Sequence, residues 1–206
     1  MDTLTPPYLL LAAPVLSDPN FERTVVLVGH HTEEGAVGWI VNRLVDGGAK
    51  ALLPEEVAAT IHPDTPLRIG GPVATPGLIV VHRDPFEGID SIDMAPGLRV
   101  SATPAVLPRV FKSAPADDPV GGLLVFGYSG WGPGQLEHEM EEGSWLVLPY
   151  DPAFAFPAPV QVYYVTLPET DALTVLHAIN GDAVSPAYTY FSSAVAADGT
   201  YVYYDQ

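Results

Sequence analysis

Cysteine is absent from the 206-residue chain. Without thiols the protein has no disulfides, no thiolate nucleophile and no cysteine-ligated metal centre, and this composition is compatible with a reducing compartment. Basic residues are scarce, because 8 lysines and arginines stand against 25 acidic residues and leave a formal net charge of -17. Such a surface repels phosphate backbones, so we expect no direct binding to nucleic acid.

Membrane-spanning runs, internal repeats and long linkers are missing as well. The early apolar run from Tyr8 to Val15 is too short to cross a bilayer, and no basic region precedes it. We therefore expect a cytoplasmic protein without membrane association. Apolar residues make up 48% of the chain, which is enough for a sizeable core, so residues 1–206 are expected to form a single domain.

What the sequence does contain is a series of short apolar segments separated by glycine, proline and acidic turns, which predicts many strands and few helices. The region from residue 24 to residue 41 predicts a hairpin, and Pro54-Glu55-Glu56 predicts the start of a short helix. The expected strands cover residues 8–15, 24–29, 36–41, 67–69, 77–82, 98–101, 123–126, 146–148, 160–166, 188–191 and 201–204.

A second helix is predicted near the end of the chain. Thr166 to Glu169 fits a capping box, and apolar residues then recur at helical spacing up to a stop at Asn180-Gly181. This segment carries the clearest helix signal in the sequence.

The stretch from Gly127 to Trp145 is the least interchangeable part of the sequence. It follows an apolar run, and its first eight residues include four glycines, which predicts a strand that ends in a tight turn. Pro133 suits the first turn of a helix, and Gly143 suits the position just after its end. The pattern therefore predicts a strand, a glycine-rich turn, a short helix and a new strand at Trp145.

Several of these landmarks occur together in a recognisable order. The ordered set is Asp18 to Val26, His30, Glu34 to Gly38, Asn42-Arg43, Gly70 to Val73, and Gly127 to Glu137. It resembles the YqgE/AlgH family of bacterial proteins, also called UPF0301, over roughly residues 6 to 152. The resemblance implies one α/β (α+β) domain with a curved, largely antiparallel mixed sheet that is barrel-like, with helices packed around it. The part from residue 153 to residue 206 is divergent, because it is longer and more aromatic than the usual ending.

The resemblance implies no defined chemistry. The family is uncharacterised at the biochemical level, and some members are named as transcriptional regulators without a recognisable DNA-binding motif. A DNA-binding regulator is therefore one alternative function, and it rests on the family label alone. The acidic charge of this chain argues against it.

Serine-hydrolase chemistry is a second alternative, suggested by Gly127-Tyr128-Ser129-Gly130-Trp131. The segment is similar to the G-x-S-x-G elbow of hydrolases, but Trp131 stands where the elbow needs a small residue. The resembled family commonly has alanine where this chain has Ser129. We therefore predict no catalytic residue in this segment.

A metal-dependent hydrolase is the third alternative. His138 lies one helical turn from Glu142, and His30 or His82 could supply a further ligand. A charge run on a short helix is more often a solvated face. The sequence therefore predicts no metal and no cofactor.

The favoured hypothesis is a non-enzymatic binding or regulatory protein with a protein or small-molecule partner. Its groove would be framed by the glycine-rich stretch, whose backbone amides, Gln135 and Trp131 would hold the ligand. The candidate binding residues are Phe21, Arg23, His30, Asn42, Arg43, Gly71, Tyr128, Gly130, Trp131, Gly134, Gln135 and Glu137.

Overall fold

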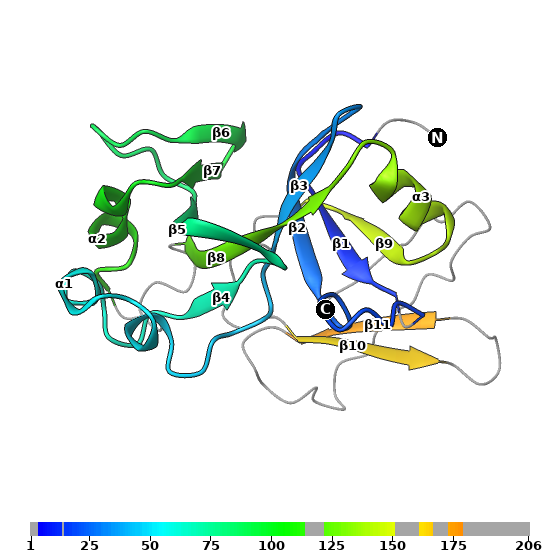
Figure 1. Cartoon of the computed structure of the whole chain (residues 1–206), viewed down its shortest axis with the longest axis horizontal. Helices are drawn as coiled ribbons and strands as arrows, with labels where there is room; N and C mark the ends of the chain where they lie inside the picture. Colours follow the sequence, from blue (N-terminus) through cyan, green and yellow to red (C-terminus); the bar gives the residue numbers. More distant parts are fainter. Residues whose placement is uncertain (1–3, 14, 114–121, 151–160, 167–172, 179–206) are drawn as a thin grey trace.

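The computed structural model describes residues 4–13, 15–113, 122–150, 161–166 and 173–178. Nine strands of this described part form one curled, mostly antiparallel sheet in the order β6-β7-β5-β8-β3-β2-β1-β9, with β4 beside β8 (Figure 1). The sheet and its few short helices confirm the predicted fold class of a single domain with a curved mixed sheet. The strands are β1 Tyr8–Ala12, β2 Val25–Thr32, β3 Gly35–Ile40, β4 Leu67–Ile69, β5 Val73–His82, β6 Ile92–Ala95, β7 Leu98–Ser101, β8 Gly122–Trp131 and β9 Trp145–Pro149.

Strand β8 joins the two halves of the sheet. Along one edge it pairs antiparallel with β5, and along the other it pairs first parallel with β4 and then antiparallel with β3. The predicted strand ended at Phe126, but β8 continues to Trp131, so the expected glycine turn is wrong over Gly127 to Gly130. Gly127 lies within the strand at a φ of 76°, a conformation that favours glycine. A Cβ at this position would also lie only 2.9 Å from the Val73 carbonyl oxygen.

The first three strands form a meander that includes the predicted hairpin. Strands β1 and β2 pair antiparallel, β2 and β3 form the expected hairpin, and β1 also pairs with β9. The β2–β3 register shifts between Val28 and His30. Such a bulge adds one residue and reverses which side chains face which side of the sheet. It brings His31, rather than His30, to the face on which Tyr8 lies.

The helices are short and lie against the sheet (Figure 1). They are η1 Ala49–Ala51, α1 Glu55–Ala58, η2 Pro104–Val106, α2 Leu107–Val110 and α3 Gln135–Glu141. The predicted helix after Gly132 is confirmed as α3, which starts after Gly134 at a φ of 70° and is followed by Gly143 at a φ of 76°. No helix among the described residues is long and apolar enough to cross a membrane.

Three buried apolar clusters hold these elements together. Alternating residues of β1 divide between two of them: Leu9 and Leu11 join one, while Tyr8 and Leu10 join the cluster that α3 covers through the fully buried Leu136. The third cluster lies between β4, β5, β8 and the segment of η2 and α2, and it includes Leu107.

The C-terminal helix prediction is wrong. Residues Leu173–Ala178 form strand β11, which pairs antiparallel along its whole length with β10, Gln161–Thr166. The helical spacing of apolar residues is a local signal, and a strand that finds a complete partner overrides it. Strand β6 lies in a segment expected to be irregular. The strands expected at 188–191 and 201–204 lie outside the described residues.

Candidate functional site

Helix α3 is fastened to the sheet by the carboxylate of Glu139. Its Oε2 accepts hydrogen bonds from the indole Nε1 of Trp131 at 2.9 Å and of Trp145 at 2.8 Å. Both indole rings are buried, with 5% and 4% exposure. A buried indole N–H needs an acceptor, and a carboxylate is a strong one. Glu139 therefore holds the end of β8, the start of β9 and α3 in one arrangement.

Gln135 completes the same group of contacts. Its Oε1 accepts a hydrogen bond from the Gly132 backbone N–H at 3.1 Å, and its Nε2 donates to Glu139 Oε1 at 2.8 Å. The side chains of Gln135 and Trp131 were expected to hold a ligand, but their polar groups are already used inside the protein. We call this set, Trp131, Gln135, Glu139 and Trp145, the α3 anchor.

Phe21 connects the α3 anchor to the loop before β2. Its ring stacks on Trp131 at a centroid distance of 5.9 Å and meets Trp145 edge-on at 5.4 Å. The two indoles meet each other edge-on at 5.9 Å. Such geometries stabilise an aromatic group beyond its burial alone. Phe21 is thus a packing residue of the anchor.

A second polar chain ties α3 to β1 and β2. Tyr8 Oη lies 2.7 Å from His31 Nδ1, and His31 Nε2 lies 2.8 Å from Glu137 Oε1. Because a carboxylate only accepts, Nε2 carries a hydrogen, and with a neutral ring the Tyr8 hydroxyl donates to Nδ1. Burial first, and then the charge of Glu137, raise the pKa of Tyr8. The phenol therefore keeps its proton and the chain is fully satisfied.

The corner before β2 is held by Asn42 and Arg43. Asn42 Oδ1 accepts from the Val25 N–H at 2.8 Å, and its Nδ2 donates to the Arg23 carbonyl at 2.9 Å. Arg43 donates to the carbonyl of Asn20 at 2.8 Å. Both predicted site residues thus support the loop, while the exposed Arg23 adopts a φ of 58° that non-glycine residues rarely take.

The remaining glycine-rich positions allow close contacts between backbones. Gly71 has a φ of 152°, and a Cβ there would collide with the Tyr128 carbonyl oxygen. Gly130 lies beside the Tyr128 ring, because a Cβ added at Gly130 would lie 3.1 Å from a ring carbon of Tyr128. Ser129 is fully buried and donates to the Gly70 carbonyl at 3.0 Å. Its hydroxyl is therefore positioned as a structural donor and not as a nucleophile.

The histidines of the metal hypothesis do not come together. His30 is exposed on β2, His82 is buried at the end of β5, and His138 lies on α3, 3.5 Å from Glu142 Oε1. No cluster of three or more side chains able to bind a metal occurs within the described part of the chain.

Of the predicted site residues, the structure joins Phe21, Trp131, Gln135 and Glu137 around α3, and Asn42 and Arg43 at the adjoining corner. His30 stands apart. Sequence reasoning missed Tyr8, His31, Glu139 and Trp145. Two local signals existed: the tryptophans on either side of the helix, whose indoles need partners if buried, and the spacing of Gln135 and Glu139, one helical turn apart. Neither identifies Glu139 as the shared acceptor.

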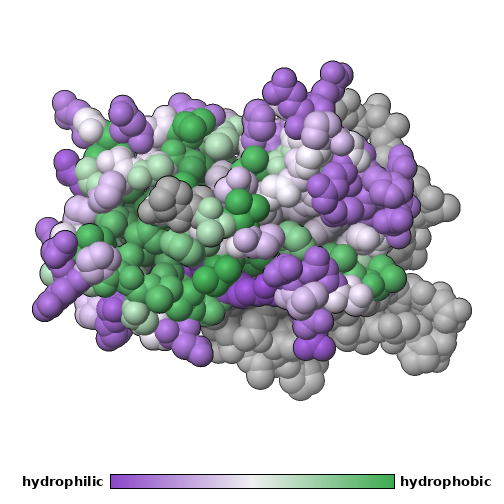
Figure 2. Space-filling view, viewed as in Figure 1, coloured by the Kyte–Doolittle hydropathy of each residue, from purple (hydrophilic) through white to green (hydrophobic). Residues whose placement is uncertain are grey.

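An open apolar groove lies elsewhere, on the face formed by the η1–α1 segment, β4, β5, β8 and the η2–α2 segment. Figure 2 shows hydrophobic residues gathered over this side of the molecule. The groove encloses about 460 Å³, and none of the described residues that line it is charged. Leu52 and Phe126 are 58% and 37% exposed. Its lining includes Leu52, Leu53, Val57, Leu78, Leu107 and Phe126, with Thr103 as a polar neighbour.

Comparison with known proteins gives consistent matches. The family model described as AlgH-like matches residues 9–179. A UPF0301 protein of Ruegeria pomeroyi is 37% identical over 154 residues, which cover 72% of this chain and 81% of the relative. A UPF0301 protein of Anaeromyxobacter dehalogenans is 35% identical over 171 residues, which cover 78% of this chain and 84% of the relative.

Two solved structures share the fold. The solution structure of the AlgH protein from Pseudomonas aeruginosa matches with a TM-score of 0.58 and 29% identity, over 77% of this chain and 84% of that one. The crystal structure of a protein from Corynebacterium diphtheriae matches with a TM-score of 0.57 and 29% identity, over 76% of this chain and 81% of that one.

Proposed function

The chain belongs to the AlgH-like (UPF0301) family, and we propose that it is a non-enzymatic, cytoplasmic binding or regulatory protein that takes an uncharged apolar small molecule in the groove. The observation that carries the proposal is the groove itself: an open apolar cavity of about 460 Å³ whose lining, in the part of the chain that the structure describes, has no charged residue. Volumes of a few hundred Å³ with apolar walls are typical of small-molecule sites.

The chemistry of the ligand follows from the lining and from the charge of the protein. An ionic ligand would lose its hydration without gaining a partner, because no charged side chain lines the groove. An anionic ligand would in addition be repelled by the net charge of -17. The hydroxyl of Thr103 offers one polar contact. The ligand is therefore neutral, mainly apolar, and carries at most a few polar groups.

The predicted glycine-rich site is a less suitable ligand site. Trp131, Gln135 and Glu139 satisfy one another, so a ligand that used them would first have to break internal hydrogen bonds. Of the other candidate residues, His30 is exposed and stands apart from this group, and Glu137 contacts His31 through one oxygen. We propose that Trp131 and Gln135 of the candidate list support the fold and that the groove holds the ligand.

Binding of the uncharged dye Nile red, followed by its fluorescence, tests this function. We expect saturable binding to the wild type and a several-fold weaker affinity for Leu52→Gln, because Leu52 lines the groove and is 58% exposed. The matched control is Ile92→Gln on β6, where an apolar residue is 64% exposed but lies outside the groove. Both variants change exposed side chains and leave the core intact.

Two outcomes would contradict the proposal. One is the absence of saturable dye binding by the folded wild type. The other is equal loss of affinity in Leu52→Gln and Ile92→Gln, which would mean that the dye samples exposed apolar residues in general. If the groove binds, competition between Nile red and neutral metabolite fractions then identifies the ligand class.

A further inference from the structure

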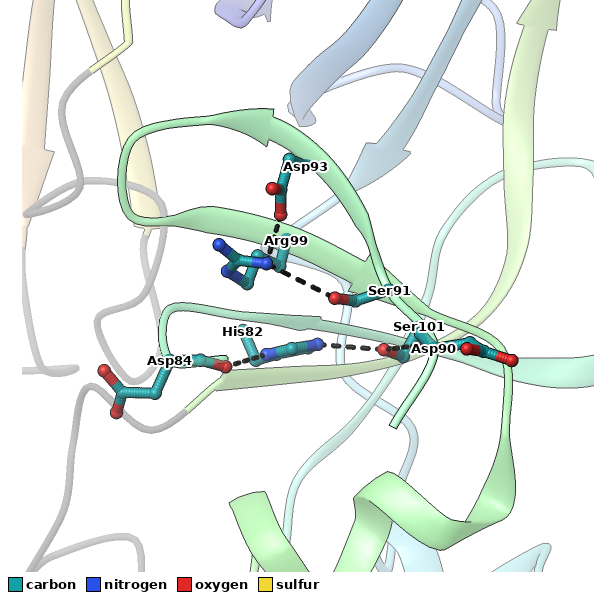
Figure 3. A network of polar contacts seen from close by, with 7 residues as sticks. All are labelled: His82, Asp84, Asp90, Ser91, Asp93, Arg99 and Ser101. Atoms are coloured by element: carbon teal, nitrogen blue, oxygen red, sulfur yellow. Dashed lines mark hydrogen bonds and ion pairs between the residues drawn. The ribbon is translucent and has the colours of Figure 1, made fainter. Parts of the chain in front are cut away.

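A cluster of polar contacts surrounds the buried His82 at the end of β5 (Figure 3). Its residues neither line the groove nor belong to the α3 anchor. His82 is the last residue of β5 and is fully buried. Its Nδ1 lies 2.9 Å from the carbonyl oxygen of Asp84, and its Nε2 lies 3.0 Å from Ser101 Oγ on β7. Ser101 Oγ in turn lies 2.9 Å from the carbonyl oxygen of Asp90. These contacts join both ends of the loop of residues 83–91 to the sheet.

The three contacts need three hydrogens. The carbonyl oxygens of Asp84 and Asp90 can only accept, so His82 Nδ1 must carry one hydrogen and Ser101 Oγ must give its own to Asp90. The contact between His82 Nε2 and Ser101 Oγ then needs a hydrogen on Nε2. A neutral imidazole and one hydroxyl supply two hydrogens in total. All three bonds form together only when the ring is an imidazolium.

The surroundings of His82 oppose the imidazolium. Burial, the largest influence, lowers the pKa of His82; the hydrogen bond to the Asp84 carbonyl raises it, Arg99 lowers it, and the Asp84 carboxylate raises it. Arg99, on β7, is paired with Asp93. The lowered pKa keeps the ring neutral at neutral pH, with its proton on Nδ1.

Further described neighbours of His82 carry no charge. On β8, Gly122 pairs with His82. A Cβ added at Gly122 would lie 3.5 Å from His82 Cβ and 2.7 Å from Val110 of α2, so Val110 also packs close by. From the loop, the Phe86 ring lies at a centroid distance of 5.5 Å. The titration of His82 is therefore set by burial, Asp84 and Arg99.

We propose that protonation of His82 fixes the loop of residues 83–91 to the sheet, and we call this set of contacts the latch. When the ring is neutral, the single hydroxyl hydrogen of Ser101 serves either His82 Nε2 or the Asp90 carbonyl, and one contact is lost. When the ring takes up a proton from solvent, Nε2 donates to Ser101, and the hydroxyl hydrogen is committed to Asp90. Both ends of the loop are then held locally, while the buried charge lowers the stability of the whole fold. This device is independent of the binding function proposed above.

The first test is made on the wild-type protein, by ¹⁵N NMR of the His82 ring. At pH 7.5 we expect the tautomer with hydrogen on Nδ1, since the Asp84 carbonyl only accepts. On acidification we expect both ring nitrogens to become protonated while the protein is still folded. Observation of the Nε2–H tautomer, or of acid unfolding before any titration of His82, would overturn the proposal.

The second test measures the loop by hydrogen exchange. The reporter is the Ile89 amide, which donates to the Phe86 carbonyl at 3.1 Å within the loop. After correction for intrinsic exchange, we expect its protection against openings at the Asp90 end, in which His82 stays buried, to rise roughly 3- to 10-fold across the His82 titration, the effect of one added hydrogen bond. Ser101→Ala should lose this rise, whereas Ser91→Ala should keep it, because the Ser91 hydroxyl contacts Arg99 and not His82.

An unchanged protection in the wild type, or an equal rise in Ser101→Ala, contradicts the latch. If Ser101→Ala does not fold, the ring measurement on the wild type still decides, because it needs no substitution.

Discussion

Replacement of Glu139 by alanine should be among the most destabilising changes on α3. The substitution leaves the indole N–H groups of Trp131 and Trp145 without their acceptor in an environment where both rings are at most 5% exposed. An unsatisfied buried donor costs about 1–3 kcal/mol, so two cost about 2–6 kcal/mol. Because slightly exposed rings admit some water, we expect a loss of about 2–4 kcal/mol, a large part of a typical domain stability.

Two further variants separate the hydrogen bonds from other effects of the substitution. Glu139→Gln keeps one side-chain oxygen for the two indoles and loses the acceptor for Gln135 Nε2, so we expect a loss of about 1 kcal/mol. Glu141→Ala is the control, because Glu141 is exposed on the same helix. Substitutions at such exposed positions usually change stability by less than about 0.5 kcal/mol.

Urea unfolding followed by tryptophan fluorescence gives the free energy of unfolding, and the indole N–H resonances give the local state. In Glu139→Ala the resonances of Trp131 and Trp145 should shift, whereas that of Trp39, which packs in another core cluster, serves as the internal reference. Equal stability of Glu139→Ala and Glu141→Ala would refute the reasoning, because it would show that the two indoles lose nothing when their shared acceptor is removed.

Further predictions concern the backbone, the α3 attachment and pH. Gly71→Ala should lower the free energy of unfolding by more than about 1 kcal/mol, because the added Cβ would collide with the Tyr128 carbonyl. Gly134→Asn should change it little, because Gly134 has a φ of 70° and open space around it. The urea midpoints of the two variants measure the difference. Tyr8→Phe should cost about 1 kcal/mol by the same assay and expose His31 Nδ1 without a donor. Burial lowers the pKa of His82 in the folded protein, so the unfolded chain binds a proton at this residue more readily. The contribution of His82 to the free energy of unfolding is therefore fully present above the unfolded pKa of about 6.5 and is lost as pH falls below it. His82→Gln should flatten this part of the profile of stability against pH.

The local parts of the fold could be predicted from the sequence. The apolar segments 24–29 and 36–41 predicted the first hairpin, although β2 runs on to Thr32, and Gly143 predicted the end of α3. Pairings between distant segments could not be predicted, because a strand's composition does not name its partner: β4 runs parallel to β8, and β11 pairs with β10 where helical spacing suggested a helix.

The candidate site was predicted less completely because its geometry depends on one inserted residue. In an unbroken strand, successive side chains alternate between faces, and His30 would share a face with Val26 and Val28. The register shift between Val28 and His30 reverses that alternation, so His31 meets Tyr8 and Glu137 while His30 is exposed. A bulge of this kind depends on pairing with β3, and no pattern within β2 alone reveals it.

The glycines of the family motifs have a shared structural explanation. Gly35, Gly71 and Gly127 come from three separate motifs, and all have positive φ. An added Cβ at Gly35 would collide with the Trp131 carbonyl and at Gly71 with the Tyr128 carbonyl, while Gly127 lies on β8 itself. The three motifs therefore mark places where backbones approach β8 too closely for a side chain. Sequence motifs set by backbone contact identify the fold without identifying a ligand. A search for the function should accordingly begin at the uncharged groove, whose walls are leucines and valines that no motif singles out.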